Sequence, residues 1–113
     1  MLDIQFKQLK FSNNLIPVII QDEASNLVYM QAFANKEALL KTKETGYVWF
    51  WSRSRQKLWK KGETSGNKLK VIRILVDCDF DSILIKVKLE GTNVCHTGKL
   101  SCFNYYLQND DIN

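Results

Sequence analysis

Hydrophobic residues occur along the chain in short runs, separated by polar or glycine-containing segments. Three of these runs are rich in β-branched residues and predict strands at residues 15–20, 71–76 and 83–89. Two more runs, 27–33 and 47–51, have apolar and aromatic patterns of strand length. Turn-forming residues fill positions 21–26, so the two strands on either side are predicted to form a hairpin.

One helix is predicted between two end signals. Asn35 is a favourable N-cap, and Gly46 stands where a left-handed residue commonly ends a helix. Together with about five strands, this helix predicts a compact, β-rich α+β domain with few helices. Residues 1–14 follow no clear period, which leaves open either a short helix or an arm on a partner.

Length and charge limit the class of protein. The 113 residues suit a single domain with a small core, and oligomerisation would help it to bury apolar surface. Sixteen Lys and Arg against twelve Asp and Glu give a net charge of +4, which favours anionic ligands such as phosphates without requiring nucleic acid.

Cysteine usage and the N-terminus indicate the compartment. Three cysteines cannot all pair within one chain, and the first residues do not form a signal peptide. No apolar run approaches the length of a membrane span. We therefore expect a soluble cytoplasmic protein whose thiols are reduced and bind metal.

Most of the metal-ligating residues lie in the last third of the chain. Residues 77–81 read Asp-Cys-Asp-Phe-Asp and follow a predicted strand directly. The other two cysteines, Cys95 and Cys102, stand close to the only histidine, His96. Thiolates suit zinc, whereas clustered carboxylates suit magnesium, calcium or manganese. The sequence therefore predicts two metal sites of different hardness side by side.

A polar stretch, residues 52–67, is too basic and too rich in glycine for a core strand, so we expect a functional loop. Arg53 and Arg55 are favoured as phosphate ligands because arginine binds phosphate in a bidentate manner. Thr64 and Ser65 add hydroxyl groups. Trp59 either stacks on a purine or packs in the core, and the two interpretations remain open.

Three segments carry a family resemblance: residues 53–67 (RSRQKLWKKGETSGN), 77–81 (DCDFD) and 95–103 (CHTGKLSCF). From about Leu15 to Phe103 the chain closely resembles phosphoribosyl-AMP cyclohydrolases, which open the adenine ring of N1-(5-phosphoribosyl)-AMP in histidine biosynthesis. The resemblance implies a cytoplasmic, intertwined homodimer that uses zinc and magnesium. Some members carry a fused pyrophosphohydrolase domain for which 113 residues leave no room, so a monofunctional enzyme with one domain over residues 1–113 is implied.

The resemblance also implies roles for single residues. It assigns zinc to Cys78, Cys95 and Cys102, with the set completed across the dimer, and magnesium to Asp77, Asp79 and Asp81. The chain departs from the family pattern at Phe80, where glycine is usual, and at Lys99 and Leu100, where two basic residues are usual.

The implied zinc set is chemically suited to hydrolysis. Three protein ligands leave a tetrahedral zinc one open position for water, whose pKa can fall to about 7. Attack at C6 would break the C6–N1 bond and keep the exocyclic nitrogen as a carboxamide, unlike the zinc deaminases, which expel the amine. His96 is the candidate catalytic proton shuttle, although a role limited to hydrogen bonding stays open.

Two other interpretations were weighed against the enzyme. In a structural zinc site, His96 would be the fourth ligand, but adjacent Cys95 and His96 are poorly spaced to hold one ion. A nucleic-acid-binding zinc module would use the aromatic and basic run 49–61. The modest net charge and the three carboxylates argue against that module.

Strand alternation gives one geometric expectation. If residues 77–81 continue the preceding strand, the three aspartates point to one face while Cys78 and Phe80 point to the other. Cys78 would then reach across an interface to Cys95 and Cys102 of a second copy, unless the strand bends or bulges. We favour the interface because a small chain gains core by pairing.

Overall fold

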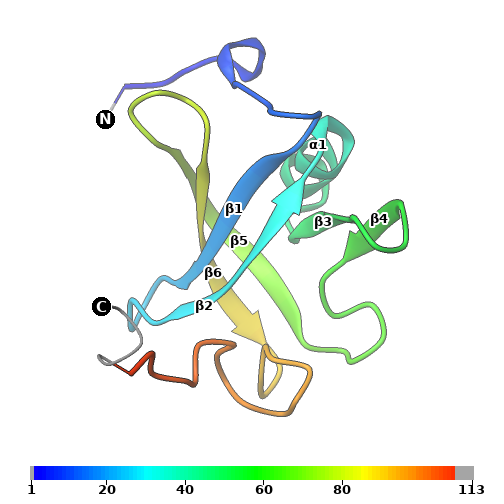
Figure 1. The fold of residues 1–113 in the computed structure, drawn as a ribbon, viewed down its shortest axis with the longest axis vertical. Coiled ribbons are helices and arrows are strands. Elements are labelled where there is room, and N and C mark those ends of the chain that lie inside the picture. Colours follow the sequence, from blue (N-terminus) through cyan, green and yellow to red (C-terminus); the bar gives the residue numbers. More distant parts are fainter. Residues whose placement is uncertain (1, 109–113) are drawn as a thin grey trace.

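The structure is a computed structural model that describes residues 2–108. Within this range the chain forms six strands, one α-helix and one 3-10 helix (Figure 1). In chain order these elements are η1 (Phe6–Gln8), β1 (Ile16–Asp22), β2 (Val28–Ala34), α1 (Lys36–Thr45), β3 (Trp49–Ser52), β4 (Lys57–Lys60), β5 (Lys68–Val76) and β6 (Ile83–Glu90). The expected β-rich α+β domain is confirmed.

The main sheet has the strand order β2-β1-β6-β5. Strands β1 and β2 form the expected antiparallel hairpin, and β5 and β6 form another. The two hairpins meet through β1 and β6, which are parallel, with Val18 beside Ile83 and Ile20 beside Ile85. A parallel pair needs a long crossover connection. Here the crossover from β1 to β6 contains, along the chain, β2, α1, β3, β4 and β5.

The core lies on one face of the two central strands. Alternate residues of β1 and β6 are buried, in keeping with the two-residue period of a strand: Ile16, Val18, Ile20, Ile83, Ile85 and Val87. Helix α1 contributes Ala38 and Leu39 to the same core, and Phe50 of β3 joins them. The parallel pair β1–β6 therefore anchors the rest of the domain.

Helix α1 begins and ends where its local signals place it. The Asn35 side chain accepts a hydrogen bond from the Ala38 amide at 2.8 Å, which satisfies one of the free amides of the first turn. Gly46 has φ 76°, and its amide donates to the Thr42 carbonyl. This left-handed cap ends the helix at Thr45, as predicted.

The stretch expected to be a loop, residues 52–67, is partly a strand. Its residues Lys57–Lys60 form β4, which pairs antiparallel with β3 and places Trp59 beside Phe50. The two rings are 5.4 Å apart, and this packing against a core residue stabilises a strand that carries two lysines at its ends. Residues 53–56 form the turn between β3 and β4, and residues 61–67 form the loop between β4 and β5.

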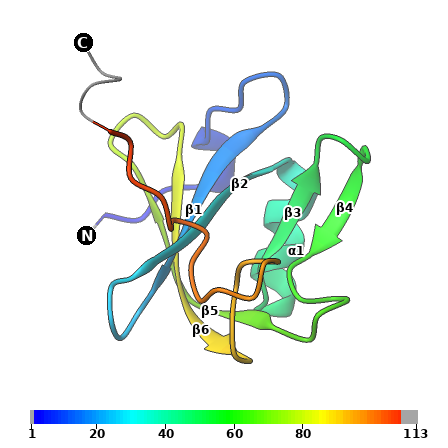
Figure 2. The same cartoon turned by 60° about the horizontal axis from the view of Figure 1, so that its bottom comes forward.

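The N-terminal segment, left open by the sequence, contains the short helix η1 and packs partly against the core through Phe6, Leu9 and Phe11. Neither helix within residues 2–108 has the length and apolar character needed to cross a membrane. After β6, the chain (orange to red) passes beside the green loop between β4 and β5 (Figures 1 and 2). These two irregular segments face each other at one end of the domain.

Candidate functional site

Cys95 and Cys102 lie on the two sides of a turn that follows β6. The Cys95 amide donates to Lys99, and the Gly98 amide donates back to the Cys95 carbonyl, so this turn is closed by the backbone. On the other side, the Cys102 amide donates to the Tyr29 carbonyl at 2.8 Å, which fixes Cys102 against β2. The fold thus holds two of the three predicted thiol ligands from separate anchors.

The two sulfur atoms are near enough to alter each other's ionisation. Hydrogen bonding from Thr97, whose hydroxyl lies 3.0 Å from the sulfur, lowers the pKa of Cys95, and Cys102 and Lys61 act in the same direction. Burial raises the pKa of Cys102, and the neighbouring Cys95 adds to that rise. Cys95 therefore ionises more easily than Cys102. A cation that binds thiolates would stabilise the ionised form of both residues, so the pair fits zinc.

A cavity of about 190 Å³ lies beside this pair. Five of its lining residues were singled out from the sequence: Trp59, Thr64, Ser65, Cys95 and His96. His96, the residue after Cys95, is exposed and lines the cavity. The structure therefore brings together the candidate proton shuttle, one thiol and the hydroxyl groups of the loop. Trp59 is half-buried, so it packs on Phe50 and also lines the cavity.

The same cavity is also lined by Asn67, Asn93 and Val94, which sequence reasoning missed, and by Lys61 and Gly62, which it left among the many polar residues of the loop. Lys61 is only 9% exposed, and its ammonium group donates to the Val94 carbonyl at 2.6 Å. Burial lowers the pKa of Lys61, while the nearby Cys102 and Cys95 act to raise it. In the sequence Lys61 was one of several loop cations, and nothing local marked it as the buried one.

Asn67 joins the loop to the segment after β6. Its side-chain oxygen accepts the Thr92 amide at 3.0 Å, and its side-chain nitrogen donates to Asn93 at 3.3 Å. Asn93 in turn donates to the Cys95 carbonyl at 3.0 Å. The position of Cys95 is therefore set by a chain of hydrogen bonds that begins in the loop between β4 and β5.

Arg53 and Arg55 do not line this cavity. Both are exposed in the β3–β4 turn, where Arg53 lies over the Phe33 ring at 4.2 Å and Arg55 lies 6.0 Å from the centre of the Trp59 ring. Each guanidinium thus lies over an aromatic face, and Arg55 also donates through its Nε to the Ser52 hydroxyl at 3.4 Å. Their predicted role as phosphate ligands remains a prediction.

The three aspartates come together in the turn between β5 and β6. Asp77, Asp79 and Asp81 each offer an oxygen atom such that all three lie within 4.8 Å of one another. Strand β5 ends at Val76, and the Asp77 carboxylate accepts the amides of Asp81 and Ser82 at 2.9 and 3.0 Å. Residues 77–81 do not continue the strand. Of the alternatives that the sequence left open, the chain bends here, and a turn closed by Asp77 gathers the carboxylates.

Crowding of these carboxylates changes their ionisation. Hydrogen bonding to Asp79 and Asp77 raises the pKa of Asp81 to about 6. Burial acts to raise the pKa of Asp77, but hydrogen bonds from Ser82, Asp81 and Asp79 outweigh it and hold that pKa well below its usual range. At a pH below about 6, the cluster therefore holds a proton that a cation can replace. Three oxygen ligands at this spacing fit magnesium.

Within one chain, the two predicted metal sites are not side by side. Strand β6 of eight residues separates the aspartate turn from the turn that carries Cys95, a span of about 26 Å at the usual rise per residue. Figure 1 shows the β5–β6 turn (yellow-green) at one end of the sheet and the orange segment at the other. Sequence proximity was misleading because an extended strand carries the chain across the whole domain.

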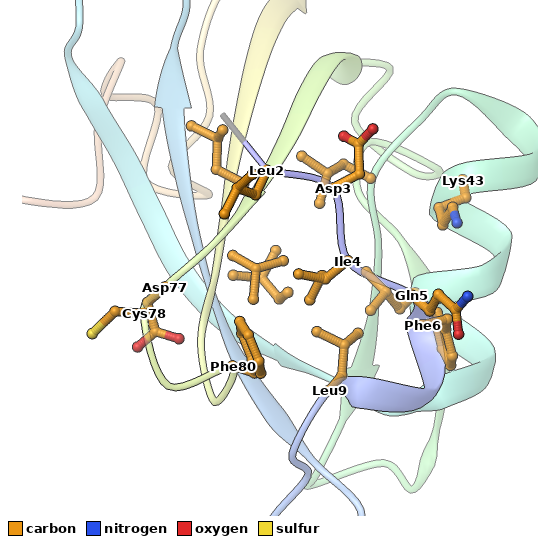
Figure 3. Close-up of a pocket in the computed structure, with 15 residues that line it drawn as sticks. Leu2, Asp3, Ile4, Gln5, Phe6, Leu9, Lys43, Asp77, Cys78 and Phe80 are labelled. Carbon is orange, nitrogen blue, oxygen red and sulfur yellow. The ribbon is translucent and has the colours of Figure 1, made fainter.

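Cys78 belongs to the aspartate turn and is exposed. Among the described residues it joins neither Cys95 nor Cys102 in a metal-sized group. A second cavity of about 600 Å³ lies nearby, between the N-terminal segment, α1 and β5, and its walls are mainly apolar. Figure 3 shows the Cys78 sulfur pointing away from this cavity. The larger cavity therefore borders the aspartate turn, and Cys95 and His96 line the other cavity instead.

Comparison with known proteins identifies the family. Residues 30–104 match the family model described as phosphoribosyl-AMP cyclohydrolase. A protein of that name from Methanosarcina mazei is 58% identical over 100 residues, which cover 88% of this chain and 82% of the relative. Another from Archaeoglobus fulgidus is 49% identical over 111 residues and 98% of both chains.

A longer relative also matches. The histidine biosynthesis bifunctional protein of Buchnera aphidicola is 54% identical over 102 residues, which cover 90% of this chain and 48% of the relative. The family match includes both cysteines of the turn after β6, the aspartate turn and the loop between β4 and β5. The resemblance found in the sequence is confirmed, and the chain belongs to the phosphoribosyl-AMP cyclohydrolase family of hydrolases.

Proposed function

We propose that this chain opens the adenine ring of N1-(5-phosphoribosyl)-AMP by hydrolysis of the N1–C6 bond, as a cytoplasmic enzyme of histidine biosynthesis. The observation that supports it most directly is the cavity in which His96 and Cys95 face Trp59, Thr64 and Ser65. A proton-transfer group, a soft metal ligand, an aromatic face and two hydroxyl groups are what hydrolysis of a purine nucleotide needs.

Zinc is the proposed cofactor at Cys95 and Cys102. When bound, it would supply a water molecule of lowered pKa, about 7, and therefore a nucleophile at neutral pH. The two cysteines hold this position from separate anchors, the backbone turn at Cys95 and the hydrogen bond from Cys102 to β2. Such fixed ligands keep the attacking oxygen in one place relative to the cavity.

His96 is the proposed proton carrier. Addition of water at C6 makes that carbon tetrahedral, and the C6–N1 bond then breaks as N1 gains a proton. His96 can accept the proton from the water and deliver it to N1, because it lines the cavity and an imidazole ring can both accept and donate a proton. The exocyclic nitrogen stays on C6 and becomes the carboxamide of the product.

The loop between β4 and β5 would hold the rest of the nucleotide. Thr64 and Ser65 are exposed at the cavity wall and can donate hydroxyl hydrogens to phosphate or ribose oxygens. Trp59 offers the purine a partly open aromatic face. Arg53 and Arg55 carry positive charge on the adjoining turn, where a phosphate group at the edge of the cavity would meet them.

Magnesium is the proposed ion at Asp77, Asp79 and Asp81, whose oxygen atoms lie within 4.8 Å of one another. Below about pH 6, where Asp81 is protonated, the ion would displace that proton when it binds. Calcium also binds carboxylate oxygens, but magnesium suits a small turn with few protein ligands better, because it keeps several of its water ligands.

A homodimer would complete the zinc site. Cys95 and Cys102 are one ligand short of the three that a catalytic zinc usually has, and Cys78 is exposed at the far end of the same chain. In addition, a cavity of about 190 Å³ is smaller than most nucleotide-sized pockets, which begin near ~300 Å³. Cys78 of a second copy would supply the missing thiol, and its neighbouring aspartates would then stand beside the zinc.

In this dimer the zinc and magnesium sites would lie side by side, as the sequence predicts, although they are far apart within one chain. The soft and hard sites are adjacent across the interface, although β6 separates them along the chain. Each of the two sites in the dimer would take Cys95, Cys102 and His96 from one copy and the aspartate turn from the other.

The test is a direct assay of ring opening, followed by ultraviolet absorbance with phosphoribosyl-AMP as substrate. We expect turnover that a zinc chelator abolishes and added zinc restores. Cys102→Ser should lose both zinc and activity, whereas Asp79→Asn should keep zinc and lose part of its response to magnesium. Oligonucleotide binding without turnover would instead support the nucleic-acid-binding module.

A further inference from the structure

Lys61 is a buried cation without a carboxylate partner. Its side chain follows β4 into the domain interior, where only 9% of the residue is exposed. Lysine is rarely buried to this extent unless its charge is paired. Within residues 2–108, the one ion pair of the structure joins Arg73 to Glu23 and leaves Lys61 without such a partner.

The surroundings of the ammonium group show what takes the place of a carboxylate. The group donates to the Val94 carbonyl at 2.6 Å, immediately before Cys95 in the chain. It lies over the Trp59 ring, 5.5 Å from its centre. The ionisable groups that act on it are the thiols of Cys95 and Cys102, whose thiolate forms would attract its positive charge.

We infer that Lys61 is a positioning residue for the zinc site: its hydrogen bond to Val94 holds the Cys95–His96 turn in place, and its charge balances the cysteine ligands. The inference rests on the proposed function, because it takes zinc as the ion at Cys95 and Cys102. A divalent ion with three thiolates carries a net charge of −1, and a lysine beside it brings the local total to zero.

The other hydrogen bonds across this junction do not supply that charge. Asn67 binds Thr92 and Asn93 through a neutral amide, and Asn93 binds the Cys95 carbonyl. They fix the path of the backbone as Lys61 does. Lys61 alone among these residues both reaches the backbone next to Cys95 and acts on both sulfur atoms.

Metal affinity is the measurement that tests this role. Purified protein without metal would be titrated with cobalt(II), followed by the thiolate-to-cobalt absorption, and with zinc in competition with a chromophoric chelator. We expect Lys61→Met to weaken zinc binding by about tenfold or more, the usual effect of losing a group that supports metal ligands. Lys61→Arg keeps the charge and should lie closer to the unchanged protein.

Lys60→Met is the matched control. Lys60 is the adjacent lysine, but its ammonium group lies over the Tyr47 ring, 5.0 Å from the ring centre. Among the described residues, it is Lys61 that binds the Val94 carbonyl. Zinc affinity should be unchanged in this variant, although it loses the same charge. If Lys60→Met and Lys61→Met weaken zinc equally, general electrostatics rather than position is responsible, and the inference is wrong.

Other outcomes are equally decisive. Unchanged zinc affinity in Lys61→Met, with a raised KM for the nucleotide, would make Lys61 a substrate ligand and overturn the positioning role. If Lys61→Met does not fold, as judged by circular dichroism, Lys61→Gln replaces it, since glutamine keeps a donor without the charge. Wild-type zinc affinity in that variant would also refute the inference. Failure of the unchanged protein to bind zinc would instead refute the proposed function.

Discussion

A β-carbon on Gly62 would stand 2.3 Å from the Asn67 carbonyl oxygen. The loop between β4 and β5 therefore closes on itself more tightly than any side chain at that position allows, and the Gly66 amide closes it further by donating to the Gly62 carbonyl at 2.8 Å. Because Asn67 also binds Thr92, this close approach sets the distance between the loop and the turn that carries Cys95.

Gly62→Ala should therefore destabilise the protein through two effects. Gly62 has φ +87°, where an L-residue costs about 1–2 kcal/mol, and the added methyl group would meet backbone atoms that cannot turn aside. We expect the free energy of unfolding to fall by more than about 2 kcal/mol, with reduced zinc binding, measured by urea denaturation and metal analysis.

Gly66→Ala is the control for backbone conformation. Gly66 has a similar φ of +80°, but a β-carbon there would meet nothing within 4 Å. The free energy of unfolding of this variant should fall by only about 1 kcal/mol, the cost of the left-handed conformation alone. Equal losses for the two variants would show that the contact with Asn67 does not matter.

Asp81 predicts a pH dependence of stability without metal. Its pKa is raised to about 6 in the folded chain, so the folded state binds more protons than the unfolded state between about pH 4 and pH 6. This contribution to stability is present below pH 4 and is lost as the pH rises through 6. Magnesium should restore stability at pH 7 and do little at pH 5, where protons compete for the same oxygen atoms.

Thermal unfolding with and without magnesium at these two pH values measures the effect. Asp81→Asn is the control, because it removes the crowded charge and one ion ligand together. The variant should be more stable than the unchanged chain at pH 7 without metal and should respond less to magnesium. The same magnesium response at pH 5 and pH 7 in the unchanged chain would contradict this account.

Phe80 provides a third prediction, because it has φ 66° although it is not glycine. Its ring lines the larger cavity near Leu9, and its carbonyl accepts the Lys10 amide at 2.8 Å (Figure 3). Phe80→Ala and Phe80→Gly both remove the ring, but only alanine keeps the penalty of the left-handed conformation. The glycine variant should be more stable than the alanine variant by about 0.5–1 kcal/mol, after allowance for its more flexible unfolded chain.

Urea denaturation of both Phe80 variants beside the unchanged chain gives this difference. An alanine variant as stable as the glycine variant would mean that the turn relaxes when the ring is removed. The observed φ is one that glycine adopts without strain, and the packing of the ring beside the N-terminal segment explains how this chain accommodates phenylalanine.

Elements with local signals were predictable from the sequence. Helix α1 has Asn35 and Gly46 at its two ends, and both act through neighbours within four residues. Strands β1 and β6 are marked by β-branched runs because both are central in the sheet. Strand β4 was missed because its lysines suggest a loop, while the packing of Trp59 on Phe50 that stabilises it spans a hairpin.

The candidate site depended more on contacts that are distant in sequence. Residue type alone marked the thiols, His96 and the aspartates as possible ligands. It could not distinguish Lys61 from the exposed cations of the same loop, because its burial depends on Val94, 33 residues later. Likewise, it placed the aspartates beside the cysteines, because the length of β6 across the domain becomes clear only once the sheet is known.

The shared zinc site makes the most demanding prediction, because it requires two defective proteins to restore each other. Cys78→Ser and Cys102→Ser should each be inactive. In a mixed dimer, one site would take Cys95 and Cys102 from the first protein and Cys78 from the second, and would be intact. With random exchange at equal amounts, half of the dimers are mixed and each has one working site of two, so about a quarter of full activity should return.

Mixing Cys95→Ser with Cys102→Ser is the matched control. These two residues would belong to the same half of each site, so every site in the mixed dimer keeps one defect and no activity should return. Native mass spectrometry of differently labelled subunits would verify exchange in both mixtures. If exchange is complete and the first mixture stays inactive, Cys78 does not act across an interface. The third ligand must then come from the same chain, which would require the β5–β6 turn to leave its place at the far end of the sheet.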